Sequence, residues 1–152
     1  MKIFGWNCRD ICNALTVNAL RASIKVHNPD IIFLSETKAS KHRINRVASL
    51  LGFPNYICVE AFGKLGGICL FWPQHIQVEV FEFDPQLIAV SIHSNVSVWN
   101  LVGFYSPPQK SKRRIAWENL HALLESLKIQ RKRVVMLAAL LCLTFSKTYY
   151  LI

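Results

Sequence analysis

The chain has 152 residues, 52% of them hydrophobic and 18% charged, and its formal net charge is +9. This hydrophobic content excludes a disordered chain, and the few glycines and prolines, which follow no period, exclude collagen-like and low-complexity classes. The length suits one compact domain. The longest apolar run, residues 134–143, is well short of the roughly 20 residues that cross a bilayer, so we expect no membrane role. The first residues turn polar too soon for a secretory signal, and we expect an intracellular protein.

The first third of the chain alternates between predicted strands and predicted helices. Residues 2–7 form a mostly apolar run that predicts a strand, and residues 31–34 form an uninterrupted apolar run typical of a strand buried on both faces. Asn13 is placed to cap a helix between these two strands. Ser40 is placed to cap a second helix, which ends at Gly52, where a C-terminal glycine is favoured.

The next part of the chain is rich in β-branched and aromatic residues, and turn signals divide it into short runs. Five strands are predicted there, at residues 56–59, 68–72, 77–83, 87–92 and 96–104. Their spacing predicts an antiparallel meander with tight turns. A third helix around residues 115–127 and a strand at 134–137 follow. The whole order predicts a one-domain α/β fold with a mixed sheet.

Two polar residues follow the carboxyl ends of the first two predicted strands. Asn7 ends the first strand, and Glu36 comes directly after the second. Sites in open α/β sheets gather beyond such strand ends. If the two strands are parallel neighbours, one carboxylate and one amide oxygen meet at the same rim and make half of a site for a hard cation such as Mg²⁺. The alternative is that both residues only cap strand ends, and the spacing leaves both interpretations open.

Five cysteines are spread over the chain, namely Cys8, Cys12, Cys58, Cys69 and Cys142. They lack the paired spacing of a zinc site, and no close histidine completes a set of four ligands. Isolated cysteines among apolar neighbours usually act as small hydrophobic residues. We therefore expect buried thiols in a reducing compartment.

Four ordered motifs carry a resemblance to a known family. They are Trp6-Asn7-Cys8-Arg9, the segment Pro29 to Lys38 with its Ser35-Glu36-Thr37, the segment Gly66 to Trp72 with its two glycines, and the segment Gly103 to Pro108 around Tyr105. Together they resemble the endonuclease/exonuclease/phosphatase superfamily over about residues 2–137. The nearest likeness is to the nuclease domain of plant LINE-type (non-LTR) retrotransposons.

The resemblance implies a fold, a reaction and a set of site residues. The fold would be a four-layer α/β sandwich, with two β-sheets face to face between flanking helices, incomplete at its C-terminus. The reaction would be metal-assisted hydrolysis of a phosphodiester bond in DNA. Glu36 would carry a Mg²⁺ or Mn²⁺ ion, Asn7 would orient the metal or the phosphate, and Tyr105 would contact the scissile phosphate. A nuclear location, and a reverse transcriptase domain in a longer parent protein, are also implied.

The chain departs from the family pattern near residue 137. Family members continue the strand into Gly-Asp-x-Asn and later carry an Asp-His pair, which position the attacking water and the phosphate. Here residues 134–141 read VVMLAALL, and residues 137–152 contain no Asp, Asn, Glu or His. Losing such groups costs roughly 10²–10⁴-fold in rate. We therefore interpret residues 1–137 as a partial domain and residues 138–152 as a divergent apolar tail, and expect weak or no activity.

Basic residues crowd the region around the third predicted helix. The candidates for nucleic-acid contact are Lys110, Lys112, Arg113, Arg114, Arg131, Lys132 and Arg133. Such a cluster favours a polyanion and predicts DNA as a partner, although a solvated helix with basic ends is the alternative. Three classes of function stay open: a metal-dependent nuclease, a catalytically dead basic nucleic-acid binder, and a remnant that does not fold.

Overall fold

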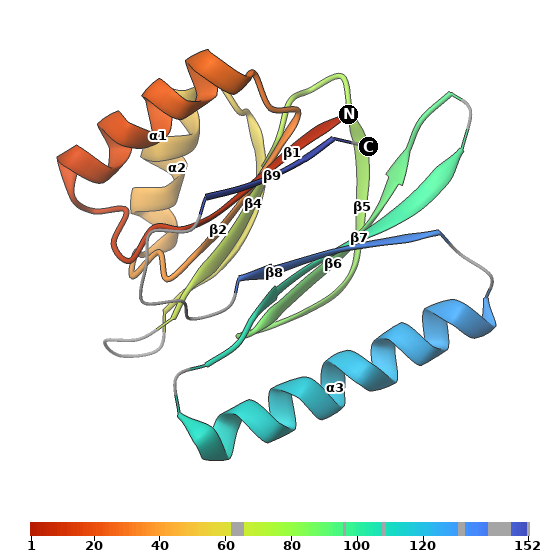
Figure 1. The fold of residues 1–152 in the computed structure, drawn as a ribbon. Coiled ribbons are helices and arrows are strands. Elements are labelled where there is room, and N and C mark those ends of the chain that lie inside the picture. Colours follow the sequence, from red (N-terminus) through yellow and green to blue (C-terminus); the bar gives the residue numbers. More distant parts are fainter. Residues whose placement is uncertain (62–65, 96, 108, 131–132, 140–146, 152) are drawn as a thin grey trace.

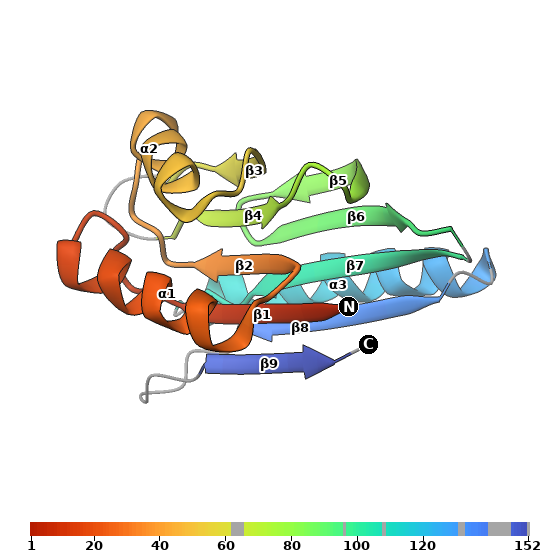
Figure 2. The ribbon, with the colours of Figure 1, turned by 90° about the horizontal axis from the view of Figure 1, so that it is seen from above.

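The computed structural model describes residues 1–61, 66–95, 97–107, 109–130, 133–139 and 147–151. Within these residues, helices flank two β-sheets that pack face to face (Figures 1 and 2). Each sheet contains parallel and antiparallel pairs. The α/β sandwich expected from the family resemblance is therefore confirmed.

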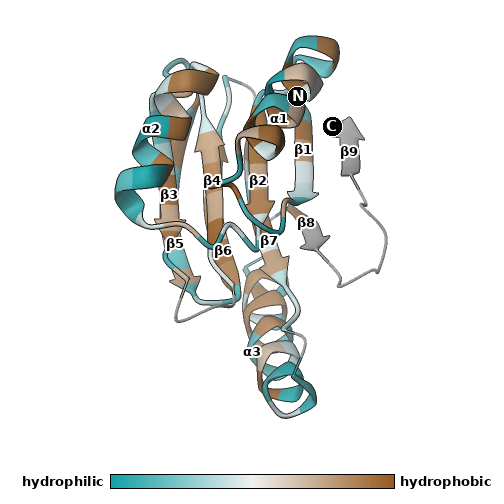
Figure 3. Cartoon of the chain, turned by 90° about the vertical axis from the view of Figure 1, so that its left-hand side faces the viewer, coloured by the Kyte–Doolittle hydropathy of each residue, from teal (hydrophilic) through white to brown (hydrophobic). Residues whose placement is uncertain are grey.

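The first sheet has the strand order β3-β4-β2-β1-β9. Its strands are β1 (Lys2–Asn7), β2 (Ile31–Ser35), β3 (Asn55–Val59), β4 (Ile68–Trp72) and β9 (Lys147–Leu151). Strands β1 and β2 are parallel, and the other pairs in this sheet are antiparallel. Figure 3 shows β2 and β4 coloured as hydrophobic along most of their length, as expected for strands that are covered on both faces.

Helices α1 (Ala14–His27) and α2 (Lys41–Leu51) cover the outer face of the first sheet. Both begin at the predicted caps. The Asn13 side chain accepts a hydrogen bond from the Leu15 N–H at 2.9 Å, and the Ser40 hydroxyl accepts one from the Arg43 N–H at 3.4 Å. Helix α2 ends at Gly52, whose φ of 75° is the left-handed conformation that glycine tolerates.

The second sheet has the strand order β5-β6-β7-β8. Its strands are β5 (Gln77–Asp84), β6 (Leu87–His93), β7 (Val98–Tyr105) and β8 (Val134–Ala139). Helix α3 (Lys110–Ile129) connects β7 to β8, which are parallel, and packs on the outer face of this sheet. Among the helices within the described ranges, none combines the length and apolarity needed to cross a membrane.

The predicted meander is wrong as a single antiparallel unit, because its five strands divide between the two sheets. Strands β3 and β4 belong to the first sheet and β5, β6 and β7 to the second. A turn in which the Ile76 N–H donates to the Pro73 carbonyl at 3.2 Å separates β4 from β5. An alternating apolar pattern marks a strand but does not say which neighbour it pairs with, and β4 pairs with the buried β2.

The expected tail contributes to both sheets where the structure describes it. Residues 138 and 139 end β8, and residues 147–151 form β9 beside β1. The remainder of the expected tail, residues 140–146 and 152, lies outside the described residues.

The two sheets approach each other closely at Gly103 in β7. A Cβ atom added to Gly103 would lie 2.5 Å from the ring of Phe33 in β2. Phe33 is 1% exposed and belongs to the core cluster between the sheets. The absence of a side chain at Gly103 thus allows β7 to pack against β2 at this point.

Candidate active site

The carboxyl ends of β1 and β2 meet at one rim of the first sheet. The two strands are parallel neighbours with Asn7 opposite Ser35, which is the condition under which the sequence placed Asn7 and Glu36 at one rim. Asn7 is half-buried, and Glu36, directly after β2, is only 8% exposed. The Asn7 Oδ1 atom accepts a hydrogen bond from the Arg9 N–H at 3.3 Å. Neighbouring strand ends therefore bring an amide oxygen and a carboxylate to the same edge.

Tyr105 reaches this rim from the end of β7 in the second sheet. Its hydroxyl donates a hydrogen bond of 2.8 Å to the Glu36 Oε1 atom across 69 positions of sequence. Burial, followed by this hydrogen bond, raises the pKa of Tyr105 above its usual range. The hydroxyl therefore keeps its proton and its donor role. The sequence predicted both residues as site residues, and the structure brings them into direct contact.

The Glu36 carboxylate has a neutral hydroxyl as its neighbour rather than a cation. Among the described side chains, no Lys, Arg or His forms an ion pair with Glu36. A buried carboxylate is costly unless it is paired or binds a metal. No group of three or more His, Cys, Asp or Glu side chains that could hold a metal occurs within the described ranges. Glu36 and Asn7 nevertheless fit Mg²⁺, which takes one or two carboxylates and completes its shell with water and phosphate oxygens.

The backbone around the site is held in an uncommon conformation. Arg9, Glu36 and Lys38 have φ angles of 57°, 54° and 49°, in the left-handed region that residues other than glycine rarely adopt. Each such residue costs about 1 kcal/mol or more, so the surrounding contacts must hold it. The loops after β1 and β2 supply two of these contacts, because the Cys8 N–H donates to the Ser35 carbonyl and the Ile11 N–H to the Thr37 carbonyl, both at 3.0 Å.

The Gly66-Gly67 pair holds the loop that carries Glu36. The Thr37 N–H donates to the Gly67 carbonyl at 3.1 Å, and the Lys38 N–H donates to the Gly66 carbonyl at 3.2 Å. Gly67 has a φ of +83°, and a Cβ atom there would collide with the Thr37 hydroxyl oxygen. The two glycines belong to one of the four ordered motifs in the sequence. Their contact with the Glu36 loop was not predicted, because it depends on a long-range pairing.

Two cysteine thiols also contact this loop, and neither was predicted as a support. The Cys8 thiol donates to the Ser35 carbonyl at 3.3 Å, and the Cys12 thiol lies 3.8 Å from the Lys38 carbonyl. Burial raises the pKa of Cys8 to about 12. Cys8 and Cys69 are buried as expected. Cys12 is exposed and Cys58 is partly exposed, against expectation, because they lie in the loop before α1 and on an edge strand. Cys142 lies outside the described residues.

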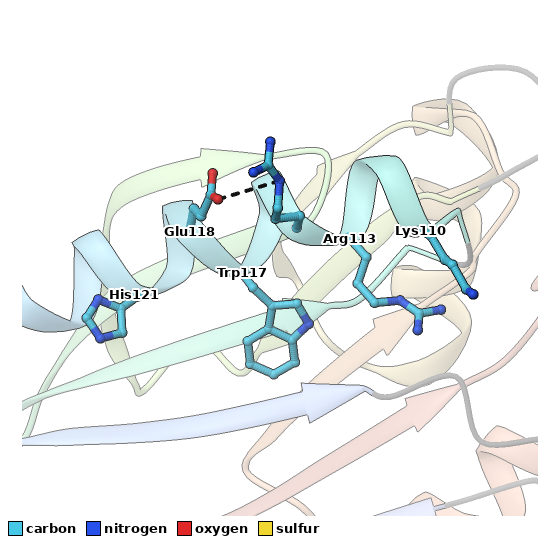
Figure 4. A pocket seen from close by; sticks show the side chains of 6 residues that line it. Lys110, Arg113, Trp117, Glu118 and His121 are labelled. Atoms are coloured by element: carbon cyan, nitrogen blue, oxygen red, sulfur yellow. Dashed lines mark ion pairs between the residues drawn. The ribbon is translucent and has the colours of Figure 1, made fainter.

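The predicted basic cluster is brought together only in part. Lys110, Arg113 and Arg114 line a hollow of about 500 Å³ on α3, together with Trp117, Glu118 and His121 (Figure 4). The Arg114 Nε atom lies 3.7 Å from a Glu118 carboxylate oxygen. Lys112 is exposed on the same helix, whereas Arg133 is exposed beyond the far end of α3. Arg131 and Lys132 lie outside the described residues. The first turns of α3 begin shortly after Tyr105, so this basic surface adjoins the strand that supplies the tyrosine.

Residues 5–137 match the family model described as the Endonuclease/Exonuclease/phosphatase family. The match spans both halves of the sandwich and includes Asn7, Glu36 and Tyr105. No curated protein sequence is similar enough to the chain to count as a relative.

Solved structures share the fold at low sequence identity. A 3′ phosphatase from Neisseria, NExo, bound to product DNA hairpin, is 16% identical, with a TM-score of 0.64 over 91% of this chain and 56% of that one. An AP endonuclease from Archaeoglobus fulgidus is 17% identical, with a TM-score of 0.63 over 91% of this chain and 56% of that one. The catalytic domain of human Nocturnin is 14% identical, with a TM-score of 0.61 over 91% and 63% of the two chains. The chain thus spans a little more than half the length of these structures.

Proposed function

We propose that this chain, which belongs to the endonuclease/exonuclease/phosphatase family, is a metal-dependent nuclease domain. As it stands, it cleaves DNA weakly or not at all. The four ordered motifs that resemble plant LINE-type elements extend the proposal to a retrotransposon protein with a nuclear location. In this proposal a reverse transcriptase domain belongs to the longer parent.

The observation that carries the proposal is the hydrogen bond between Tyr105 and Glu36. It joins the two sheets at the rim where the carboxyl ends of β1, β2 and β7 meet. Glu36 is a buried carboxylate with no cationic partner among the described side chains, and a protonated phenol lies 2.8 Å from it. This arrangement suits a metal ion and a phosphate. A structural role alone would be served equally well by an apolar pair.

Nucleases of this family generally use divalent metal ions. In this chain Glu36 would hold the ion, and Asn7 would help to orient the ion or the phosphate. A bound Mg²⁺ or Mn²⁺ ion would supply charge stabilisation at a phosphoryl oxygen. The single hydroxyl proton of Tyr105 holds Glu36 in this structure. With the ion bound to Glu36, that proton would turn toward the charge that develops on the phosphate.

We expect weak activity because of the residues at the end of β8. Ala139 is the partner of Tyr105 in the parallel ladder between β7 and β8. The family pattern Gly-Asp-x-Asn is replaced from this strand end onward by apolar residues. The group that positions the attacking water is therefore missing beside the tyrosine, and a loss of roughly 10²–10⁴-fold is expected.

Nicking of supercoiled plasmid in Mg²⁺ tests the proposal, with Glu36→Gln compared with wild type at equal concentration. The matched control is Glu82→Gln, which makes the same chemical change at an exposed position on β5. We expect Glu36→Gln to abolish nicking and to weaken Mn²⁺ binding measured by electron paramagnetic resonance, and Glu82→Gln to change neither. Equal nicking and equal Mn²⁺ binding in all three proteins would overturn the proposal.

A second candidate function is a catalytically dead protein that binds nucleic acid. The basic hollow on α3 favours it, because Lys110, Arg113 and Arg114 gather beside Trp117. Such a protein would bind DNA with a steep salt dependence that ignores Glu36. Filter binding of wild type and Glu36→Gln over a series of salt concentrations separates the two functions. Identical affinities and salt slopes, without nicking by wild type, would favour the binder.

A further inference from the structure

Two cysteines face each other across the edge of the first sheet. Cys58 in β3 and Cys69 in β4 are direct partners in an antiparallel ladder. Both side chains lie on the face that α1 and α2 cover, because both contact the same core cluster. Directly opposed residues have Cα atoms about 4.5–5.5 Å apart, within the range that a disulfide bond requires. Both are free thiols in this structure.

The two thiols differ in access and in acidity. Cys69 is 0% exposed, whereas Cys58 is partly exposed on the edge strand β3. A hydrogen bond from the Cys69 thiol lowers the pKa of Cys58, and burial raises the pKa of Cys69. Reactive cysteines combine thiolate character with exposure and often have a second cysteine beside them. Cys58 therefore suits the role of attacking thiolate, and Cys69 suits that of the thiol that completes the bridge.

We propose that Cys58 and Cys69 form a reversible cross-strand disulfide by exchange with a small-molecule disulfide such as oxidised glutathione. The Cys58 thiolate attacks one sulfur of the small disulfide and releases the other half as a thiolate. The Cys69 sulfur, after losing its proton, then attacks Cys58 and releases the second half. The two protein thiols lose two electrons and two protons, and these appear as two molecules of reduced small thiol.

The position of the bridge gives it a structural consequence. It would close the segment between β3 and β4 that contains Gly66 and Gly67. Gly67 lies two residues before Cys69, and its carbonyl accepts the hydrogen bond from the Thr37 N–H in the Glu36 loop. The disulfide would therefore fix the glycine pair that holds this loop. The exchange is independent of the proposed nuclease function, because none of its steps requires Glu36 or a metal ion.

Peptide mapping of the full chain tests the disulfide. The reduced protein is incubated with oxidised glutathione, quenched with N-ethylmaleimide under denaturing conditions, digested with trypsin without reduction and analysed by mass spectrometry. Cleavage after Lys64 places Cys58 and Cys69 on different peptides. We expect a linked pair of these peptides, lighter than the sum of the two thiol peptides by two hydrogen atoms, which disappears on treatment with dithiothreitol.

Three single variants separate the steps. Cys69→Ser should leave Cys58 trapped as a mixed disulfide with glutathione, and Cys58→Ser should leave Cys69 unmodified. Cys12→Ser is the matched control, because Cys12 is exposed and has no cysteine opposite it in a strand, and the bridge should form as in wild type. Native wild-type protein should also be alkylated at Cys58 at least about tenfold faster than at Cys69.

Three results with the wild-type protein would overturn the proposed disulfide. If Cys58 accumulates as the glutathione mixed disulfide, or if both cysteines remain reactive toward N-ethylmaleimide after oxidation, the pair does not form a bridge. A linked peptide that joins either residue to a different cysteine would overturn it as well. Because this readout uses the unchanged chain, a folding defect in the Cys69→Ser variant would not affect the conclusion.

Discussion

The carboxyl ends of β2 and β8 both lie beside Tyr105, yet they differ in character. Glu36 follows β2 and accepts the 2.8 Å hydrogen bond from the tyrosine, whereas Ala139 ends β8 as its ladder partner. The first end is polar and is held by hydrogen bonds from several segments. The second lacks the polar family motif, yet the strand still pairs in register. The difference shows that strand pairing depends on the backbone and the apolar pattern, whereas the chemistry depends on single side chains.

The largest effect is expected when the support of the Glu36 loop is broken. Gly67→Ala places a Cβ atom against the Thr37 hydroxyl at a positive φ, and should destabilise the fold by about 3 kcal/mol. Gly66→Ala is the matched control, since its φ is also positive, at +88°, but no atom lies within 4 Å of the added Cβ. It should cost about 1 kcal/mol. Urea unfolding monitored by circular dichroism measures both, and equal losses would show that the contact with Thr37 is unimportant.

The next largest effect is expected from a change that makes the carboxyl end of β8 more like that of β2. Ala139→Asp restores the carboxylate of the family pattern at the ladder position opposite Tyr105, and should raise Mg²⁺-dependent plasmid nicking by about 10²-fold. Ala138→Asp is the control, because Ala138 is the ladder partner of Phe104 and not of Tyr105. It should give no increase. Nicking by both variants at the same rate, or by neither, would contradict the assignment of this strand end to the site.

A smaller effect is expected when the hydrogen bond between the sheets is removed. Tyr105→Phe deletes the donor to Glu36 and should cost about 1.5 kcal/mol of stability at neutral pH. The pKa of Tyr105 is raised in the folded chain above its ordinary value of 10.0, so the unfolded chain releases the proton first. The contribution of Tyr105 to stability is therefore fully present below pH 10.0 and is lost as the pH rises through the pKa of Tyr105 in the folded chain.

The loss of stability at alkaline pH gives an independent measure of the hydrogen bond between Tyr105 and Glu36. Wild type should lose stability above pH 10.0 more steeply than Tyr105→Phe, by up to about 1.4 kcal/mol per pH unit. Cys8, whose pKa is also raised, is present in both proteins, so its contribution cancels in the comparison. Parallel curves for the two proteins, measured by urea unfolding at each pH, would show that Tyr105 titrates normally in the fold.

The smallest effect concerns DNA affinity. Arg114→Ala on α3 should lower the slope of log affinity against log salt by about one, because one phosphate contact is lost. Arg21→Ala makes the same change on the exposed surface of α1 and should leave the slope unchanged. Fluorescence anisotropy with a labelled duplex measures both slopes. A similar decrease for the two variants would mean that the charge acts through the net charge of the chain and that no defined surface is involved.

Local signals in the sequence predicted most of the elements. The caps at Asn13, Ser40 and Gly52 form as expected, and β1 and β4 have the predicted bounds. These features depend on hydrogen bonds and side-chain patterns within a few residues. The family resemblance implied two sheets, but which strands belong to which sheet was not predicted, because pairing partners are far apart in sequence.

The candidate site was predicted as a set of residues but not as a geometry. The family motifs contain Asn7, Glu36 and Tyr105, yet the contact between Glu36 and Tyr105 bridges two sheets. The role of Gly67 also depends on a neighbour distant in sequence, Thr37. Neither contact has a local signal. The burial of Glu36 and its hydrogen bond with Tyr105 follow from how the strands assemble, which the sequence pattern does not specify.

The close approach of Gly103 to Phe33 in the core affects the rim that carries Glu36 and Tyr105. Both residues lie a short way before the strand ends that supply Tyr105 and Glu36. The thickness of the core at this point therefore sets how far the tyrosine reaches toward the carboxylate. Over evolutionary time, a larger residue at position 103 should be accepted only together with a smaller one at position 33. Sequences related to this chain should consequently show the two positions varying as a pair, although neither would touch a substrate.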